Sequence, residues 1–167
     1  MTFEEVGVNY TIHNPEETPP EAGRVTFPAL TLDNGVTMGQ VPAMLNILGE
    51  RFGLTGATPE QRMLCQQTVL DVDDIFAEAQ SGKFTQNPER AAKWLQLLDT
   101  QLSDHKFLVS DAPTVADFHA VFATEWVHKS FSATAYDAFP RLSQWWKAIC
   151  DHPPVHQMKT GSIPMIP

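Results

Sequence analysis

The stretch from Ser110 to Phe118 constrains the fold of this 167-residue chain more than any other part of it. Within this stretch, Thr114-Val115-Ala116-Asp117 has the pattern of a helix start. We expect the Thr114 hydroxyl to accept a hydrogen bond from the N–H three residues on, and the Asp117 carboxylate to accept one from the N–H of Thr114. The residues that follow, up to Trp126, are apolar on nearly every helical face. The pattern therefore predicts a capped helix buried in a mainly helical core.

The composition, with 43% hydrophobic and 19% charged residues, is that of a soluble globular protein. Twenty acidic residues against eleven Lys and Arg give a formal charge of -9. No cluster of basic residues interrupts this balance, which argues against nucleic acid and anionic membranes as partners. A local basic patch can still bind a small anion. No apolar run approaches the roughly 20 residues of a membrane span.

The two cysteines, Cys65 and Cys150, lie far apart in the sequence and form no Cys-x-x-Cys motif. We expect two free thiols and an intracellular, reducing compartment, either cytoplasmic or organellar. The histidines show no metal-ligand spacing, so no metal site is predicted.

The first forty residues have the pattern of short strands and loops. Residues 8–13 alternate between apolar and polar types and predict a strand, which follows a helix end at residues 3–7. Residues 14–23, rich in proline and glutamate, predict a surface loop. Residues 29–38 predict a β-hairpin, because Asn34-Gly35 supplies the turn.

From Val41 onward the apolar residues recur at helical spacing. A helix from Val41 should end at Gly53, and a capping box at Thr58 to Gln61 should begin the next helix, which runs to about Ser81. Further helices are predicted from Asn87 to Leu102, from Thr114, and from Phe139 to the prolines at 153–154.

Several of these segments together resemble the glutathione transferase family. The Asp-x-Pro-Thr step and its capped helix are similar to the central helix of the family's C-terminal domain, with Ser110 at a position that is usually glycine. Phe27-Pro28 falls where the family's thioredoxin-like domain carries a cis-proline, and Gln40-Val41-Pro42-Ala43-Met44-Leu45 falls where transferases carry Gln-Ser-x-Ala-Ile-Leu. Residues 139–145 are similar to the family's Tyr-Pro-x-Leu-x-x-Trp.

The resemblance implies a mainly α fold in three parts. Residues 1–53 would be an α+β remnant of a thioredoxin-like domain and residues 54–57 a linker. Residues 58–167 would form the all-α helical bundle of the family's C-terminal domain.

Two departures from the family concern its site. The first strand and most of the first helix have no counterpart, and the Tyr, Ser or Cys that activates the glutathione thiol lies in that part, so we assign no catalytic residue in this chain. Val41 stands where a serine binds the γ-glutamyl carboxylate of glutathione. Loss of a bond to a charged group costs about 1.5–3 kcal/mol, or roughly tenfold or more in affinity.

If the glutathione site is retained, the resemblance implies that its residues here are Phe27, Pro28, Gln40, Val41 and Asp74. Asp74 is included because an acid of this helix reaches the partner subunit's glutathione in some transferases. From the residues alone, the acidic run Asp71, Asp73 and Asp74 can also be a solvated face, and its spacing is poor for chelating a metal. His119 is either a hydrogen-bonded core histidine or part of a hydrophobic substrate pocket.

A thioredoxin-like sheet without its central strand would leave backbone groups unpaired. Three arrangements avoid this: further residues before Met1, another segment or chain that fills the gap, or a rearranged N-terminal part.

Two functions follow. The first is a non-catalytic accessory subunit that binds a protein partner within a larger assembly, with an apolar tail at residues 161–167 that docks on a neighbour. The alternative is a glutathione transferase, a homodimer in this family, with about 20 residues before Met1. Its substrates would be glutathione and a small electrophile. Neither function requires a cofactor.

Overall fold

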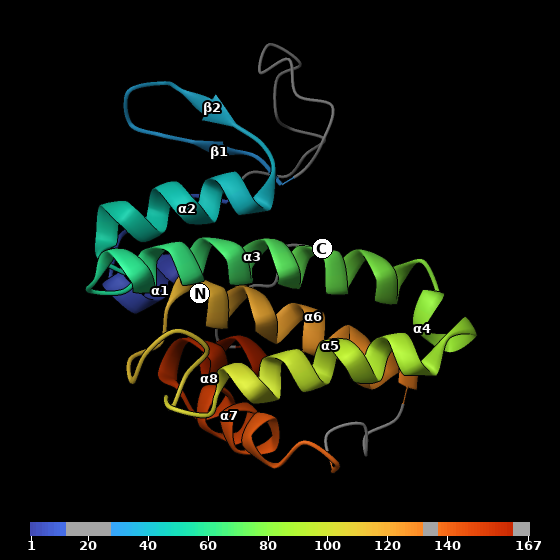
Figure 1. Ribbon diagram of the computed structural model, residues 1–167. Coiled ribbons are helices and arrows are strands. Elements are labelled where there is room, and N and C mark those ends of the chain that lie inside the picture. Colours follow the sequence, from blue (N-terminus) through green and yellow to red (C-terminus); the bar gives the residue numbers. More distant parts are fainter. Residues whose placement is uncertain (13–27, 132–136, 162–167) are drawn as a thin grey trace.

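The computed structural model describes residues 1–12, 28–131 and 137–161, and it is mainly helical, as the sequence predicts (Figure 1). Two short strands, β1 (Leu30–Thr31) and β2 (Thr37–Met38), pair antiparallel, with Leu30 opposite Met38. This hairpin lies beside α2 at one end of the molecule. The helices are α1 (Thr2–Val6), α2 (Val41–Phe52), α3 (Pro59–Gln80), α4 (Lys83–Gln86), α5 (Pro88–Gln101), α6 (Val115–Phe131), α7 (Pro140–Cys150) and α8 (Pro153–Lys159).

Local sequence signals account for most of the helix boundaries. At the start of α3 the Thr58 hydroxyl accepts from the N–H of Gln61 at 3.2 Å, while the Gln61 side chain accepts from the N–H of Thr58 at 3.3 Å. The predicted capping box is therefore confirmed. At α5 the side chain of Asn87 accepts from the N–H of Arg90, and Pro88 occupies the first helical position. The predicted end of α2 at Gly53 is also confirmed, because Gly53 takes the left-handed conformation there.

Three elements of secondary structure differ from those predicted. The predicted strand at residues 8–13 is not formed by residues 8–12, because a strand needs a hydrogen-bonded neighbour and β1 and β2 pair with each other instead. The short helices α4 and α8 were not predicted. The prolines at 153–154 end α7 and also occupy the first turn of α8.

Some predictions fall outside the described residues, namely the loop at residues 14–23, Phe27 and the tail at residues 162–167. The division of the chain at residues 53 and 58 stays a prediction. No helix in the described part of the chain has the length and hydrophobicity needed to cross a membrane.

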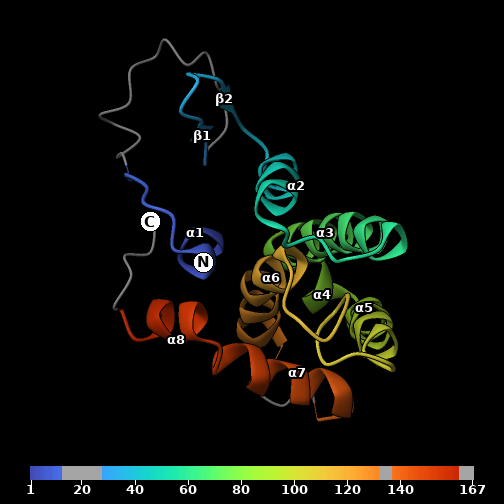
Figure 2. The same ribbon diagram turned by 90° about the vertical axis from the view of Figure 1, so that its left-hand side faces the viewer.

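Helix α6 lies at the centre of the bundle, with α3, α5, α7 and α8 arranged around it (Figure 2). At its start, α6 meets α2 closely, and Gly49 of α2 allows the approach. A Cβ atom there would lie 2.6 Å from Thr55 and 3.0 Å from Val115. The N–H of Val115 donates to the carbonyl of Leu54 at 2.9 Å. The hairpin end of the molecule is thus joined to the bundle at the first turn of α6.

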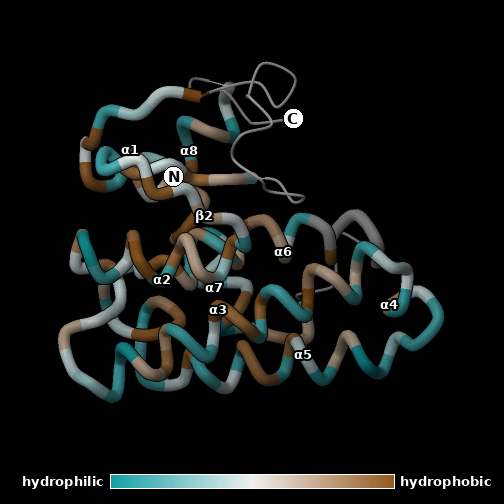
Figure 3. Tube along the Cα trace, turned by 90° about the horizontal axis from the view of Figure 1, so that it is seen from above, coloured by the Kyte–Doolittle hydropathy of each residue, from teal (hydrophilic) through white to brown (hydrophobic). Residues whose placement is uncertain are grey.

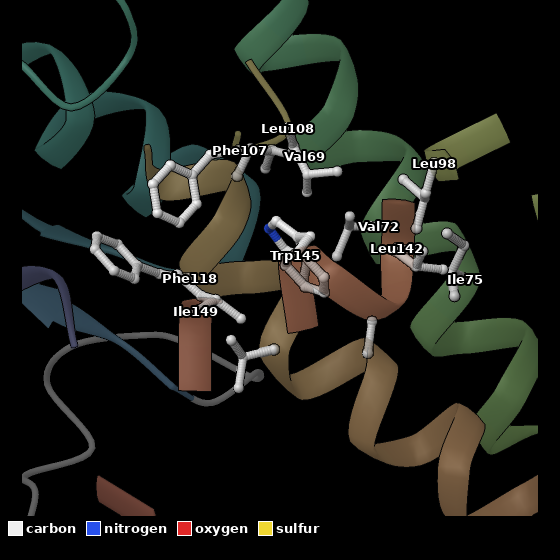
Figure 4. Close-up of a cluster of buried hydrophobic side chains, with 14 of the residues drawn as sticks. Val69, Val72, Ile75, Leu98, Phe107, Leu108, Phe118, Leu142, Trp145 and Ile149 are labelled. Atoms are coloured by element: carbon white, nitrogen blue, oxygen red, sulfur yellow. The ribbon is translucent and has the colours of Figure 1, made fainter. Parts of the chain in front are cut away.

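The hydrophobic core is built around Trp145, which lies between α3, α6 and the loop before α6 (Figure 4). Its indole N–H donates to Asp117 Oδ1 at 2.8 Å, and the N–H of Leu108 donates to the same oxygen at 2.8 Å. The other oxygen, Oδ2, accepts from the N–H and the hydroxyl of Thr114 at 2.8 and 2.9 Å. Besides Trp145, the largest fully buried side chains among the described residues are Phe84, Phe118, Ile75, Leu98, Leu108, Leu142 and Ile149.

This arrangement differs from the predicted cap in one bond. The Thr114 hydroxyl donates to the Asp117 carboxylate, and the N–H of Asp117 bonds to the backbone carbonyl of Thr114 at 3.1 Å. The buried carboxylate attracts the hydroxyl proton, because a charge-assisted hydrogen bond is stronger than a neutral one. Burial raises the pKa of the Asp117 carboxyl, while the four hydrogen bonds that it accepts favour the ionised form.

We expect Asp117→Asn to lower the free energy of unfolding by about 2–5 kcal/mol, because the amide can accept at only one of the two oxygen positions and leaves two buried donors unpaired. Urea denaturation at pH 7 measures this change. Asp111→Asn is the matched control. Its carboxylate accepts the N–H of Lys106 at the surface, and a change of about 0.5 kcal/mol or less is expected there. Equal effects of the two variants would contradict the role given to Asp117.

Candidate functional site

A cavity of about 370 Å³ lies between α2 and α3, beside the first turn of α6. The α2 side contributes Pro42, Ala43 and Asn46, which recur at helical spacing and so share one face. The remaining lining residues are Gln40, Thr55, Cys65, Gln66, Val69, Leu70 and Val115. The lining is a mixture of apolar and neutral polar groups and contains no carboxylate and no basic side chain.

Gln40 is held in an unusual backbone conformation at the edge of this cavity. Its φ is 68° and its ψ 108°, and it has the only positive φ outside glycine among the described residues. Its carbonyl accepts from Met44 and so begins α2, although its side chain makes no capping bond. A non-glycine residue in such a conformation costs about 1–3 kcal/mol and persists only where its surroundings enforce it. Among the predicted site residues that the structure describes, Gln40 alone both lines the cavity and is strained.

The structure separates the other predicted glutathione-site residues. Val41 is the first residue of α2 and is partly buried, but it does not line the cavity. Pro28 is exposed, just before β1, and Phe27 lies outside the described residues. Asp74 is exposed on α3, one helical turn beyond Leu70, which does line the cavity. Gln40 and Val41 therefore lie next to each other at the start of α2, and Asp74 lies on α3 outside the cavity lining.

The buried thiol of Cys65 points to binding rather than to nucleophilic chemistry in this cavity. Burial raises the pKa of Cys65, which keeps the sulfur in its unreactive protonated form. Both cysteines are free, as the sequence predicts. In the described part of the chain, no group of three or more His, Cys, Asp or Glu side chains is placed to hold a metal ion.

His119 of α6 and Asp73 of α3 lie close together where these two helices pack. His119 is buried on α6, and its Nε2 atom lies 3.5 Å from Asp73 Oδ1, at the outer limit of a hydrogen bond. This nitrogen has no hydrogen-bond partner among the described residues. Burial lowers the pKa of His119, and the nearby Asp73 carboxylate opposes that effect. His119 does not line the α2–α3 cavity, and among the described residues its Nε2 atom lacks the direct hydrogen bond expected of a core histidine.

Apart from Gln40, none of the residues that line the cavity was predicted as a site residue, and those missed include the polar residues Asn46, Thr55 and Gln66. The spacing of Pro42, Ala43 and Asn46 was a usable signal, since it marks one face of α2. Thr55 carried no such signal, because it lies in the connection between two helices.

Comparisons with known proteins agree on one family. A family model described as "Glutathione S-transferase, C-terminal domain" matches residues 75–153. Hematopoietic prostaglandin D synthase from Gallus gallus is 30% identical over an alignment of 156 residues that covers 84% of this chain and 77% of that protein. Elongation factor 1-gamma from Rattus norvegicus is 29% identical over an alignment of 147 residues that covers 79% of this chain but only 33% of that protein.

Solved structures show the same fold at lower sequence identity. The structure of rat hPGDS complexed with a quinoline has a TM-score of 0.80 at 18% identity, and the match covers 99% of this chain and 89% of that one. Monomeric Na-GST-3 from the hookworm Necator americanus has a TM-score of 0.80 at 17% identity, covering 98% and 90% of the two chains.

We expect His119 to make the stability of the chain depend on pH below neutrality. Because burial lowers its pKa in the folded state, the unfolded chain binds the proton more readily, and acid favours unfolding. The free energy of unfolding should fall as the pH drops below about 6.5, by at most about 1.4 kcal/mol per pH unit from this one group.

Urea denaturation between pH 5 and pH 8 tests this prediction by comparing the unaltered chain with His119→Gln, whose slope should be smaller. His156→Gln, a change at an exposed histidine of α8, is the control and should keep the slope of the unaltered chain. Parallel curves for the unaltered chain and His119→Gln would show that His119 does not titrate differently on folding.

Proposed function

This chain belongs to the glutathione S-transferase family, and we propose that within the family it serves as a non-catalytic binding subunit of a larger protein assembly. The observation that carries the proposal is an exposed apolar face at α2 and α3. The cavity supports it, since its lining offers groups for binding but no reactive thiolate or charged catalytic side chain.

The α2–α3 apolar face consists of Ile47, Met63 and Leu70, whose exposed fractions are 41%, 71% and 52%. Met63 and Leu70 are seven residues apart on α3 and so lie on one stripe of that helix. Ile47 lies one turn beyond Ala43 on α2, and both Ala43 and Leu70 line the cavity between the helices. The tube coloured by hydropathy shows hydrophobic stretches along α2, in contrast to the largely hydrophilic turn around α4 (Figure 3). Large apolar side chains gathered in this way mark protein interaction sites.

The charges around this face indicate what kind of partner it fits. Glu50, Asp71 and Asp74 lie beside it on the two helices. The nearby arginines are engaged elsewhere, Arg51 with the Asp33 carboxylate and Arg62 with the carbonyl of Ala57. We therefore propose a partner protein whose contact surface has an apolar centre and a basic rim, in accord with the net charge of -9 of this chain.

The weakened glutathione contact supports the same proposal. Val41 has no hydroxyl to offer at the start of α2, where the family's serine binds the substrate. A subunit that uses the fold as a binding surface does not need that bond. The relatives named elongation factor 1-gamma, which align with 79% of this chain, show that related sequences occur in proteins not named as transferases. The two free cysteines suit an intracellular, reducing compartment.

A specific observation also favours a second function, that of a glutathione transferase acting on small electrophiles. The strained backbone of Gln40 is the kind of feature that persists at ligand sites. Relatives named glutathione S-transferase occur in Arabidopsis thaliana and Zea mays, each matching less than half of this chain. In this case the α2–α3 apolar face would pair two copies of the chain as a homodimer.

The binding-subunit proposal predicts that Leu70→Glu releases the chain from its assembly, because a charge placed in an apolar contact is costly to desolvate. The measurement is the sedimentation of the tagged chain in an extract of its source cells, alongside the purified chain alone. Phe122→Glu is the matched control, since Phe122 is 42% exposed but lies on α6. We expect the unaltered chain and Phe122→Glu to sediment in a particle larger than a dimer, and Leu70→Glu to sediment as a monomer.

Two outcomes would contradict the proposal. If the purified chain alone forms a dimer that Leu70→Glu dissociates, the face joins two copies and the homodimeric transferase is favoured. If the chain sediments as a monomer in the extract as well as alone, the face has no partner there.

A further inference from the structure

A second cavity, of about 240 Å³, lies where the loop after α5 meets α7. Its apolar part is formed by Leu102, Trp145 and Ala148. Its polar part is formed by His105 and Lys106 from the loop and by Arg141 and Gln144 from α7. Arg141, Gln144 and Ala148 recur at helical spacing and so form one stripe of α7, next to the buried stripe that carries Trp145.

The charge of this lining is the reverse of that of the whole chain. Acidic residues outnumber Lys and Arg by 20 to 11 in the sequence, yet two permanent cations and an imidazole line the cavity and no carboxylate does. Cations gathered around a concave surface attract anions more strongly than the same charges spread over a convex one.

Two acidic residues accept from backbone N–H groups of the residues that line the cavity or follow them. Asp99 is buried and accepts from the N–H groups of Arg141 and Leu142 at 2.9 and 3.0 Å. Asp111 accepts from the N–H of Lys106 at 3.2 Å. These two carboxylates therefore hold the backbone at the cavity wall, and neither carboxylate is part of the lining.

Arg141 is oriented by the same contact. Its Nη1 atom donates to Asp99 Oδ2 at 3.2 Å, which fixes the plane of the guanidinium. Its other N–H groups have no partner among the described residues. The Lys106 ammonium lies 5.2 Å from the centre of the Phe107 ring and forms no ion pair with a carboxylate of the described residues.

We infer that this cavity binds a small organic oxyanion, a carboxylate or a phosphate carried on a compact apolar body. The guanidinium, the ammonium and the Gln144 amide are donors suited to the oxyanion, and the surface of Leu102, Trp145 and Ala148 is suited to the apolar body. The volume lies below the roughly 300–1,000 Å³ of sites for drug-sized ligands, which limits the ligand to a small one. This site is separate from the α2–α3 cavity and does not depend on the proposed function.

The test is a titration of the ¹⁵N-labelled chain with benzoate, with its neutral analogue benzamide, and with phenyl phosphate, followed by NMR. We expect saturable binding of one or both anions with a dissociation constant of about 1 mM, and none of benzamide. The shifts should be confined to residues 102–108 and 141–148 and the Trp145 indole. Added NaCl should weaken the binding. The preferred anion then distinguishes a carboxylate site from a phosphate site.

Three variants locate the binding. Lys106→Gln should weaken it about fivefold and Arg141→Gln by at least as much. Arg141→Gln removes the ion pair with the buried Asp99 and can lower the stability of the fold. The Lys106 side chain makes no ion pair among the described residues, so Lys106→Gln still tests the binding if Arg141→Gln folds poorly. Arg51→Gln is the matched control, because the Arg51 side chain is 52% exposed against 51% for Arg141, also lies beside an aspartate, and is on α2.

Equal weakening by Arg51→Gln would show general attraction of anions and overturn the inference. Shifts spread over other basic residues, equal binding of benzamide, or no saturation up to about 20 mM would overturn it as well.

Discussion

The Asp117 carboxylate is the contact on which the packing of the other helices depends. This side chain accepts four hydrogen bonds: one from the N–H of Leu108, two from Thr114 and one from the indole of Trp145 on α7. It lies inside the core, where an unpaired charge would be very unfavourable, so each donor has to be in place before the carboxylate is satisfied. The loop at residues 107–109, the start of α6 and the position of Trp145 are thereby fixed together. A second buried acid, Asp99, fixes the start of α7 in the same way.

The candidate site is connected to this centre through the first turn of α6 and through Cys65 and Val69 of α3, which line the cavity and also belong to the core. Val115 lines the α2–α3 cavity, bonds to Leu54 and packs against Gly49, and two residues later the chain reaches Asp117. Gln40 and Val41, which the family resemblance places at the glutathione site, take no part in the hydrogen bonds to Asp117. A change such as valine for serine at residue 41 alters the site and leaves the hydrogen bonds of the core untouched. This separation explains how a chain can keep the family's helical bundle while its glutathione contact is weakened.

Local signals in the sequence predicted much of the fold, and contacts distant in sequence account for what was missed. The capping box at Thr58 and the hairpin turn at Asn34-Gly35 depend on neighbouring residues, so both could be predicted. The pattern at Thr114 correctly placed the Asp117 carboxylate near the Thr114 N–H. The donors from Leu108 and Trp145 come from other elements and could not be predicted. In the structure the Thr114 hydroxyl also donates to this carboxylate, instead of accepting as predicted. Residues 8–12 alternate like a strand, yet strand formation needs a neighbour that the sequence cannot supply. Gly49 gave no sign that it permits the contact between α2 and α6, and the residues that line the two cavities come from elements far apart in the chain.

The central claim is that the family's fold persists here without its glutathione chemistry, and the affinity of the unaltered chain for glutathione tests this most directly. Isothermal titration calorimetry on the purified chain, with Val41→Ser measured alongside, gives that affinity. The account predicts no detectable heat of binding at about 1 mM glutathione for the unaltered chain, and a tighter interaction for Val41→Ser by about tenfold. A micromolar dissociation constant for the unaltered chain would contradict it, because the site would then bind its substrate despite Val41.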